Sequence, residues 1–430
     1  MQLNSSDQFY FYQSSIGRLE KLVMKYVLTD ITPTPGFVTN AFGVKVNPKH
    51  LPLVVGDREG VEAPPIPANW HADLAEFGAA LRALDLARKK FTVVELGCGW
   101  GCWLNITGVV ARQKGLDVTL IGVEGDPGHV QFAHEALTEN GFNSGDYVVH
   151  HGIASWQEGH ALFPIQEHSG VSWGLEARFN VSDDELVGLL ETGKYMHLRQ
   201  IPLSSLLPQD CDHIDLVHVD IQGAEIPLIP ASMEFLNEKV AMVLIGTHSK
   251  QIEAALFDSF LSFGWVLEVE RPAVLSVGRK LHTKVDGVQL WRNPRLLHDS
   301  NLPLCDPEDY AGNLDVKSIP ESVSADQKFS VEVIISNISQ KNWNGFGECP
   351  IHISYHWRSD SGEIIIFDGI RTNLANNFIA LNSNVSQMVD VVAPASIGIF
   401  SLELTLVHEA NIWFETADFD SCIIKIQVCE

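Results

Sequence analysis

A glycine-rich turn after an apolar strand carries the most distinctive residue spacing in this 430-residue chain. It reads Glu95-Leu96-Gly97-Cys98-Gly99-Trp100-Gly101. Because glycine has no Cβ, such a turn lets backbone N–H groups approach a bound nucleotide closely. A dinucleotide-binding turn has the spacing G-x-G-x-x-G, which would place its third glycine at Cys102 instead of Gly101. The spacing predicts a nucleotide-like ligand and disfavours a dehydrogenase.

Further polar positions lie where other predicted strands end. The second strand ends in the sequence Val123-Glu124-Gly125-Asp126-Pro127. An acidic residue there can accept hydrogen bonds from both ribose hydroxyls, so Glu124 is the candidate and Asp126 is predicted to cap the next helix. Asp220 and His248 follow two later strands. Since the carboxyl ends of parallel strands meet at one edge of a sheet, these two side chains are expected to converge.

Alternating strands and helices must position these residues, a pattern typical of a parallel sheet with helices on both faces. The last two strands are joined by a short segment, which predicts an antiparallel pair closing a seven-stranded, Rossmann-like sheet. The predicted strands are 92–96, 118–123, 147–151, 216–220, 241–245, 265–270 and 288–291. The predicted helices are 70–88, 127–140 and 183–192, and Asn69 is the expected cap of the first.

The chain separates by pattern into four regions. These are a helical and irregular lead-in (1–80), the α/β domain (81–295), a linker (296–314) and an all-β, immunoglobulin-like sandwich (315–430). Period-two alternation, as at Phe329, Val331 and Val333, predicts the strands of the sandwich. Residues 156–212 are predicted to be an insertion that either forms a wall of the substrate site or is purely structural.

Three tryptophans of the predicted sandwich, Trp343, Trp357 and Trp413, have flat rings that suit the C–H surfaces of sugars. Trp357 falls on the alternating core face, so burial is expected for it. A role of this domain in docking or dimerisation stays open beside carbohydrate binding.

Four segments together resemble a known family. The glycine turn alone is similar to the first motif of S-adenosylmethionine (SAM)-dependent methyltransferases of the Rossmann-like class. Together with residues 123–127, the sequence Asp220-Ile221-Gln222-Gly223-Ala224-Glu225 and residues 245–248, it resembles the FkbM family of these enzymes. The similar region spans roughly residues 92–265. The family often has a lysine two positions before this aspartate, where the chain has His218.

The resemblance implies a SAM-dependent O-methyltransferase that acts on a hydroxyl of a sugar, a polysaccharide or a glycosylated natural product. It implies that SAM is held by Glu95, Gly97, Cys98, Gly99, Trp100, Gly101, Glu124, Gly125, Gly152, Ile153 and Asp220. Two alternatives stay open: methylation of a polyketide-like hydroxyl, and a non-catalytic scaffold in glycan assembly.

Methyl transfer to a hydroxyl requires alignment of the oxygen and removal of its proton. A neutral imidazole suits that task near pH 7, so we expect His248 to act as general base and Asp220 to orient it or the substrate. A capping or surface role for His248, and a core position for His218, stay open. Asp220, Glu225 and His248 would also offer a mixed oxygen and nitrogen ligand set to a divalent metal, which we do not favour.

Composition limits the partners. The net charge of −25, from 29 basic and 54 acidic residues, disfavours nucleic acid and anionic membrane surfaces. Seven scattered cysteines indicate reduced thiols. No apolar run approaches the roughly 20 residues of a membrane span, and no signal peptide is evident. We expect a cytoplasmic protein with a small-molecule or glycan acceptor, and a homo-oligomer stays open.

Overall fold

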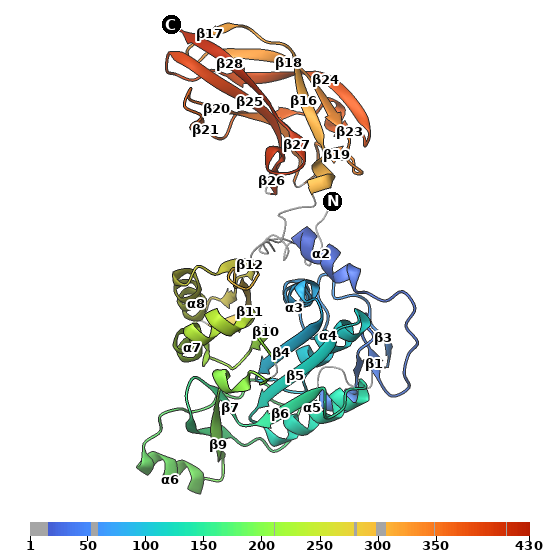
Figure 1. Cartoon of the computed structure of the whole chain (residues 1–430), viewed down its shortest axis with the longest axis vertical. Coiled ribbons are helices and arrows are strands. Elements are labelled where there is room, and N and C mark those ends of the chain that lie inside the picture. Colours follow the sequence, from blue (N-terminus) through green and yellow to red (C-terminus); the bar gives the residue numbers. More distant parts are fainter. Residues whose placement is uncertain are drawn as a thin grey trace. The chain divides into compact units, whose positions relative to one another are not determined.

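The computed structural model describes residues 16–52, 59–209, 211–278, 282–297, 307–347, 349–409 and 411–430. The chain divides into two compact units, residues 1–302 and 303–430. The first is an α/β unit and the second is all-β (Figure 1). No helix in these described ranges is long and apolar enough to cross a membrane.

A seven-stranded sheet forms the centre of the first unit, in the order β12-β15-β11-β10-β4-β5-β6. Its strands are β4 (Lys90–Leu96), β5 (Asp117–Glu124), β6 (Tyr147–His151), β10 (Ile214–Val219), β11 (Val240–Thr247), β12 (Val266–Arg271) and β15 (Gly287–Arg292). Strand β15 runs antiparallel to β11 and β12, and the other neighbours are parallel. The Rossmann-like sheet and its antiparallel closure are therefore confirmed. The chain order reverses between β4 and β10, and ligands bind at such a switch point.

Helices cover both faces of this sheet, on opposite sides in Figure 1. One face carries α3 (Leu74–Leu86), α4 (Cys102–Gln113) and α5 (Pro127–Glu139), and the other carries α7 (Glu225–Lys239) and α8 (Lys250–Ser262). Along β4, Val93 packs into the first core and Val94 into the second. Alternation of side chains thus makes the central strand apolar on both faces, as buried parallel strands require.

The N-terminal region shares the first of these cores. It contains α2 (Ile16–Lys25), β1 (Val38–Thr39), β2 (Lys45–Val46), the 3-10 helix Pro48–His50 and β3 (Gly60–Val61). Leu19, Val23 and Phe42 are buried in the core formed by α3 and α4. The predicted lead-in thus packs as part of the α/β unit.

Helix α3 begins later than the sequence predicted. The Asn69 side chain accepts hydrogen bonds from the N–H groups of His71 and Ala72 and forms a tight turn instead of a cap. Asp73 is the actual cap, because its carboxylate accepts the N–H groups of Ala75 and Glu76. Trp70 and His71 therefore lie in a loop before the helix.

Residues 153–206 form the predicted insertion. It contains β7 (Ile153–Ser155), β8 (Gly159–Pro164), α6 (Asp183–Glu191), β9 (Tyr195–Pro202) and the 3-10 helix Leu203–Leu206. The strands pair in the order β7-β9-β8 around a small core that includes Ile153 and Phe163. A hairpin of β13 (Val274–Ser276) and β14 (His282–Val285) lies between the last two sheet strands in the sequence.

Two main sheets that share one core make up the second unit. One has the order β24-β18-β16-β27 and the other β17-β28-β25-β20-β21. Strand bounds are β16 (Gly312–Ser318), β17 (Ser322–Ser324), β18 (Lys328–Asn337), β19 (Trp343–Asn344), β20 (Ile351–Arg358), β21 (Ile364–Ile366), β22 (Thr372–Asn373), β23 (Phe378–Ile379), β24 (Ser383–Val392), β25 (Gly398–His408), β26 (Ile412–Trp413), β27 (Phe419–Asp420) and β28 (Cys422–Cys429). Short 3-10 helices span Pro307–Tyr310, Ala375–Asn377 and Phe414–Thr416.

The three tryptophans proposed for sugar binding differ in their solvent exposure. Trp343 and Trp357 are 1% and 0% exposed and belong to the core, so neither can stack on a sugar. Only Trp413 of the three is half-buried. Tyr310 also packs in this core and β16 starts at Gly312, so the all-β unit begins before the predicted residue 315.

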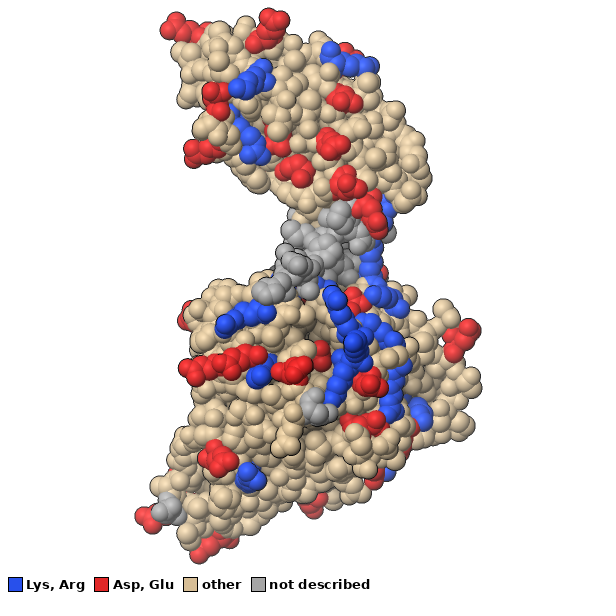
Figure 2. Space-filling view, in the orientation of Figure 1, with Lys and Arg blue, Asp and Glu red and all other residues tan. Residues whose placement is uncertain are grey.

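Basic side chains on the visible face of the first unit gather over α2 and α4, with acidic residues among them (Figure 2). Lys25 Nζ lies 2.5 Å from Asp85 Oδ1. Lys114 Nζ donates to the carbonyl oxygens of Leu84 and Asp85, in the last turn of α3, and of Ala87, its C-cap residue. A cation at a helix C-terminus satisfies these otherwise unpaired groups. This basic cluster thus has a structural role.

A buried acid ties the edge of the sheet to α3. Glu268 of β12 lies 2.9 Å from Arg82 Nε and 2.5 Å from Arg292 Nε, and all three side chains are at most 7% exposed. We predict that Glu268→Gln lowers the free energy of unfolding by about 3–5 kcal/mol, because two buried guanidinium groups lose their counter-charge. Denaturant unfolding of the full chain measures this. Glu158→Gln, whose side chain is 80% exposed, is the control and should change little. An equal effect of both would contradict the prediction.

Candidate functional site

A cavity of about 370 Å³ opens at the carboxyl ends of the central strands. The predicted site residues that line it are Glu95, Gly97, Cys98, Gly99, Trp100, Glu124, Gly125, Gly152, Ile153, Asp220 and His248. Gly101 does not line the cavity; it is the N-cap residue of α4 and has a left-handed conformation. The volume is within the range of small-molecule sites. The fold therefore brings together residues that span more than 150 positions of the sequence.

The glycine turn is shaped by two close approaches. Gly97 and Gly99 have φ values of +74° and +53°, which disfavour other residues. A Cβ on Gly97 would lie 2.1 Å from the backbone oxygen of Asp220, and one on Gly99 would lie 2.9 Å from the Trp173 ring. Glycine is therefore required both by the backbone and by its neighbours.

Glu95 organises the turn from the strand below it. Its buried carboxylate accepts hydrogen bonds from the N–H groups of Trp103, at 3.3 Å, and Leu104, at 2.9 Å. Because Gly101 has no side chain to cap α4, Glu95 performs that task from a distance. Burial raises the pKa of Glu95 to about 7. Its main contacts are thus with the helix, although it also lines the cavity.

Glu124 joins the glycine turn to the end of β5. Its two carboxylate oxygens accept the N–H groups of Gly99 and Asp126, each at 2.8 Å. The residue is 7% exposed and borders the cavity. A carboxylate oxygen can accept two hydrogen bonds, so each oxygen keeps one acceptor position.

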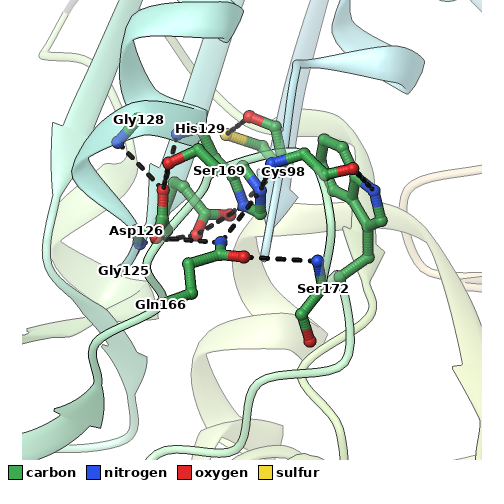
Figure 3. Close-up of polar contacts among 12 residues, drawn as sticks. Cys98, Gly125, Asp126, Gly128, His129, Gln166, Ser169 and Ser172 are labelled. Carbon is green, nitrogen blue, oxygen red and sulfur yellow. Dashed lines mark hydrogen bonds and ion pairs between the residues drawn. The ribbon is translucent and has the colours of Figure 1, made fainter. Parts of the chain in front are cut away.

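A loop of the insertion, residues 166–173, covers this part of the cavity, and we call it the roof loop. In Figure 3, Gln166 and Ser169 converge on Asp126, which caps α5 through the N–H groups of Gly128 and His129. Gln166 Nε2 and Ser169 Oγ each donate to the Asp126 carboxylate at 2.9 Å. The predicted cap is confirmed, but its second role in holding the roof loop was not predicted.

Trp173 completes the roof. Its ring stacks on His129, with ring centroids 4.0 Å apart and an interplanar angle of 3°. Gly170 N–H donates to His129 Nε2, and Trp173 Nε1 donates to the Gly170 carbonyl. These contacts place the indole over Gly99.

Glu225, the last residue of the motif D-x-x-G-x-E, explains why the motif ends in an acid. This fully buried carboxylate accepts the N–H groups of Ile221, at 3.1 Å, and Gly223, at 2.7 Å, and so closes the loop after Asp220. His248 lies between the two acids of the motif. Its Nε2 is 3.0 Å from Asp220 Oδ1 and its Nδ1 is 3.3 Å from Glu225 Oε1.

This position sets the charge of His248. Burial lowers its pKa, but Asp220 and Glu225 outweigh burial and raise the pKa to about 10. The two carboxylates favour the protonated imidazole, which cannot accept another proton, and this disfavours the general-base role expected for His248. Instead it holds Asp220, whose side chain is 43% exposed. Burial would raise the pKa of Asp220, but the bond with His248 brings it below its usual range.

The acids and the histidine pair with each other and do not converge on a common point. Among the residues that the structure describes, no group of three or more histidines, cysteines and acids could hold a metal ion.

A second end of the cavity includes Trp70 and His71, from a polar and aromatic run for which the sequence left open both a cover over the cofactor or substrate and a helix cap with a packed tryptophan. It is lined by Trp70, His71, Glu76, Trp100, Trp103 and His218, which we call the aromatic chamber. His218 is 2% exposed, and its Nε2 lies 3.4 Å from Glu76 Oε1. Burial lowers the pKa of His218, but Glu76, Glu95 and Asp220 together raise it above its usual range. The adjacent Trp70 and His71 before α3 were the only sequence signal for this chamber.

Comparison with known proteins assigns the family. No family model matches the chain. Over 269 residues it is 39% identical to a protein of Jannaschia sp. (strain CCS1) named "Putative methyltransferase", and the alignment covers 62% of this chain and 96% of that protein. The chain belongs to the methyltransferases.

Solved structures similar to this methyltransferase include FkbM from Methylobacillus flagellatus KT, with a TM-score of 0.31, 15% identity, and coverage of 51% of this chain and 54% of that chain. Another is TrmK from M. capricolum in complex with S-adenosyl-homocysteine (SAH). Its TM-score is 0.26 and its identity 8%, and the match covers 50% of this chain and 67% of that chain. At such scores neither structure informs the substrate or the mechanism.

The roof loop yields a prediction. Asp126→Ala removes the acceptor of two backbone and two side-chain donors, so amide hydrogen exchange across residues 166–173 should become faster. The lost cap also costs about 1–2 kcal/mol of stability. Ser182→Ala removes the cap of α6 without touching the roof loop and is the matched control. Unchanged exchange in the roof loop of the Asp126 variant would contradict this role.

Proposed function

We propose that this methyltransferase transfers a methyl group from SAM to a hydroxyl group. The observation that carries the proposal is the Glu124 carboxylate, which borders the cavity beside Gly99 and has one further acceptor position on each oxygen, with His129 Nδ1 3.8 Å from Oε1. A vicinal ribose diol presents two O–H donors and matches these positions. A 2′-phosphate would place a second negative charge against this buried acid, which disfavours a phosphorylated dinucleotide.

The remaining contacts fit the adenosine and methionine parts of SAM. Gly125, Gly152 and the apolar side chains Ile153 and Phe163 line one part of the cavity, and such an apolar lining suits a flat purine ring. A Cβ on Gly125 would lie 2.8 Å from Phe163. The turn from Gly97 to Gly99 lets backbone groups reach the polar methionine end. When bound, SAM supplies an electrophilic methyl group.

The acceptor is proposed to enter the aromatic chamber. The half-buried ring of Trp70 lines it together with the Glu76 carboxylate, and the edges of the buried Trp100 and Trp103, 3% and 2% exposed, complete the lining. Flat aromatic surfaces next to hydrogen-bonding groups suit sugar rings, which have both C–H faces and hydroxyls. The resemblance to the FkbM family supports the same class, a hydroxyl of a sugar, polysaccharide or glycosylated natural product. In this proposal Asp220, which lies beside His248 and lines the cavity, accepts a hydrogen bond from the acceptor.

Two alternatives make different predictions. A polyketide-like acceptor would use the aromatic rings but would not need the polar groups of the chamber. A non-catalytic scaffold would bind neither SAM nor SAH. Screening of methyl glucoside, methyl rhamnoside and methyl glucuronide for the mass gain of one methyl group distinguishes the acceptor classes.

We predict that Glu124→Gln weakens SAM and SAH binding by about 10- to 100-fold, because a charged acceptor of two hydroxyls is worth about 1.5–3 kcal/mol. Isothermal titration calorimetry of the full chain measures both ligands. Glu234→Gln, an exposed acid on α7, is the control and should bind as the unmodified protein does. Absence of SAM and SAH binding to the unmodified protein would overturn the proposed function, and binding of NAD in their place would favour a dehydrogenase.

A further inference from the structure

The two carboxylates beside His248 favour its protonated form, and the cavity offers another histidine as the proton acceptor for methyl transfer. Four histidines line it: His71, His129, His218 and His248. Three are held by other groups. His129 stacks under Trp173, His218 pairs with Glu76, and His248 lies between two carboxylates.

His71 differs from the other three. Among the described residues, its ring makes no hydrogen bond or ion pair, although its backbone N–H donates to Asn69. The ring is held instead by packing against three tryptophan rings. Its centroid lies 5.3 Å from that of Trp70, 5.5 Å from that of Trp103 and 6.1 Å from that of Trp100. The side chain is half-buried and borders the cavity, so both nitrogens stay available to a ligand.

The charged groups around His71 come from three elements. Glu76 belongs to α3, His218 to β10, and Asp220 follows β10. Burial lowers the pKa of His71 below its usual range, His218 lowers it further, and the two acids partly oppose this change. His71 is therefore neutral at pH 7, unlike His248.

Unpaired donors in the same chamber point to a polar ligand. Nδ1 of the buried His218 makes no hydrogen bond, and Trp70 Nε1 also has no hydrogen-bond partner. Buried polar atoms are rarely left without a partner, so these donors fit oxygens of a bound acceptor. A hydroxyl-bearing ring held by them would lie next to His71.

We propose that His71 accepts the proton of the acceptor hydroxyl, an inference that rests on the proposed function. In this step the hydroxyl oxygen forms a bond to the methyl carbon, and the carbon–sulfur bond breaks with its electron pair going to sulfur. The hydroxyl proton passes to the His71 ring. The positive charge of the sulfonium is thereby replaced by that of an imidazolium, which Glu76 and Asp220 stabilise.

The first test does not require a known acceptor. Diethyl pyrocarbonate acylates neutral, accessible imidazoles, and peptide mass mapping locates the product. Across about pH 5 to 8 we expect His71 to react faster than His218 and His248, with a midpoint below its ordinary pKa of about 6.5. His71→Asn should bind SAH as tightly as the unmodified protein. A midpoint above pH 7, or modification of His71 no faster than of His248, would overturn the proposal.

The second test uses methyl transfer to methyl glucoside, methyl rhamnoside and methyl glucuronide. His71→Asn should lower the rate on any accepted glycoside by about 10²- to 10⁴-fold and remove the fall in rate at low pH. His71→Gln is a second variant that replaces His71→Asn if that variant does not fold. His134→Asn, at an exposed histidine on α5, is the control. A His71 variant that keeps its rate while Asp220→Asn loses it would assign the proton to Asp220. Failure of SAH binding in the unmodified protein would instead refute the proposed function itself.

Discussion

The site depends on one close approach between two strand ends. Gly97, after β4, leaves no space for a side chain because the backbone oxygen of Asp220, after β10, occupies it. These strands are neighbours at the point where the chain order of the sheet reverses. The contact puts the glycine turn and the loop of the D-x-x-G-x-E motif side by side, and the cavity lies along them. A larger residue at position 97 would separate the two halves of the site.

Buried carboxylates hold this arrangement together, each by accepting backbone N–H groups. Glu95 fixes the start of α4, Glu124 fixes the turn against β5, and Glu225 fixes the loop after Asp220. A charged acceptor forms stronger hydrogen bonds than a neutral one, and in a dry interior these bonds also offset part of the cost of burying the charge. These acids, which the sequence suggested as ligand-binding residues, therefore serve mainly to hold the backbone of the loops around the cavity.

The sheet could be predicted from the sequence because its signals are local. Apolar runs ending in Gly97, Glu124 and Asp220 revealed the strands, and their order follows from alternation with helices. The aromatic chamber could not be predicted in the same way. Whether His71 faces solvent or a cavity depends on where α3 begins, and the competing caps Asn69 and Asp73 made that boundary ambiguous. The protonation state of His248 likewise depends on Glu225, whose distance from it is a property of the folded chain.

Asp126 serves both α5 and the roof loop, and this shared use has a consequence for access to the cavity. Outward movement of residues 166–173 must break the bonds of Gln166 and Ser169 to Asp126 and separate Trp173 from His129. None of these losses requires α5 itself to unwind, because the backbone donors of Gly128 and His129 keep their acceptor. Detachment of this loop would therefore leave the start of α5 intact and would break the contacts of Gln166, Ser169 and Trp173 together with the Gly170 N–H bond to His129.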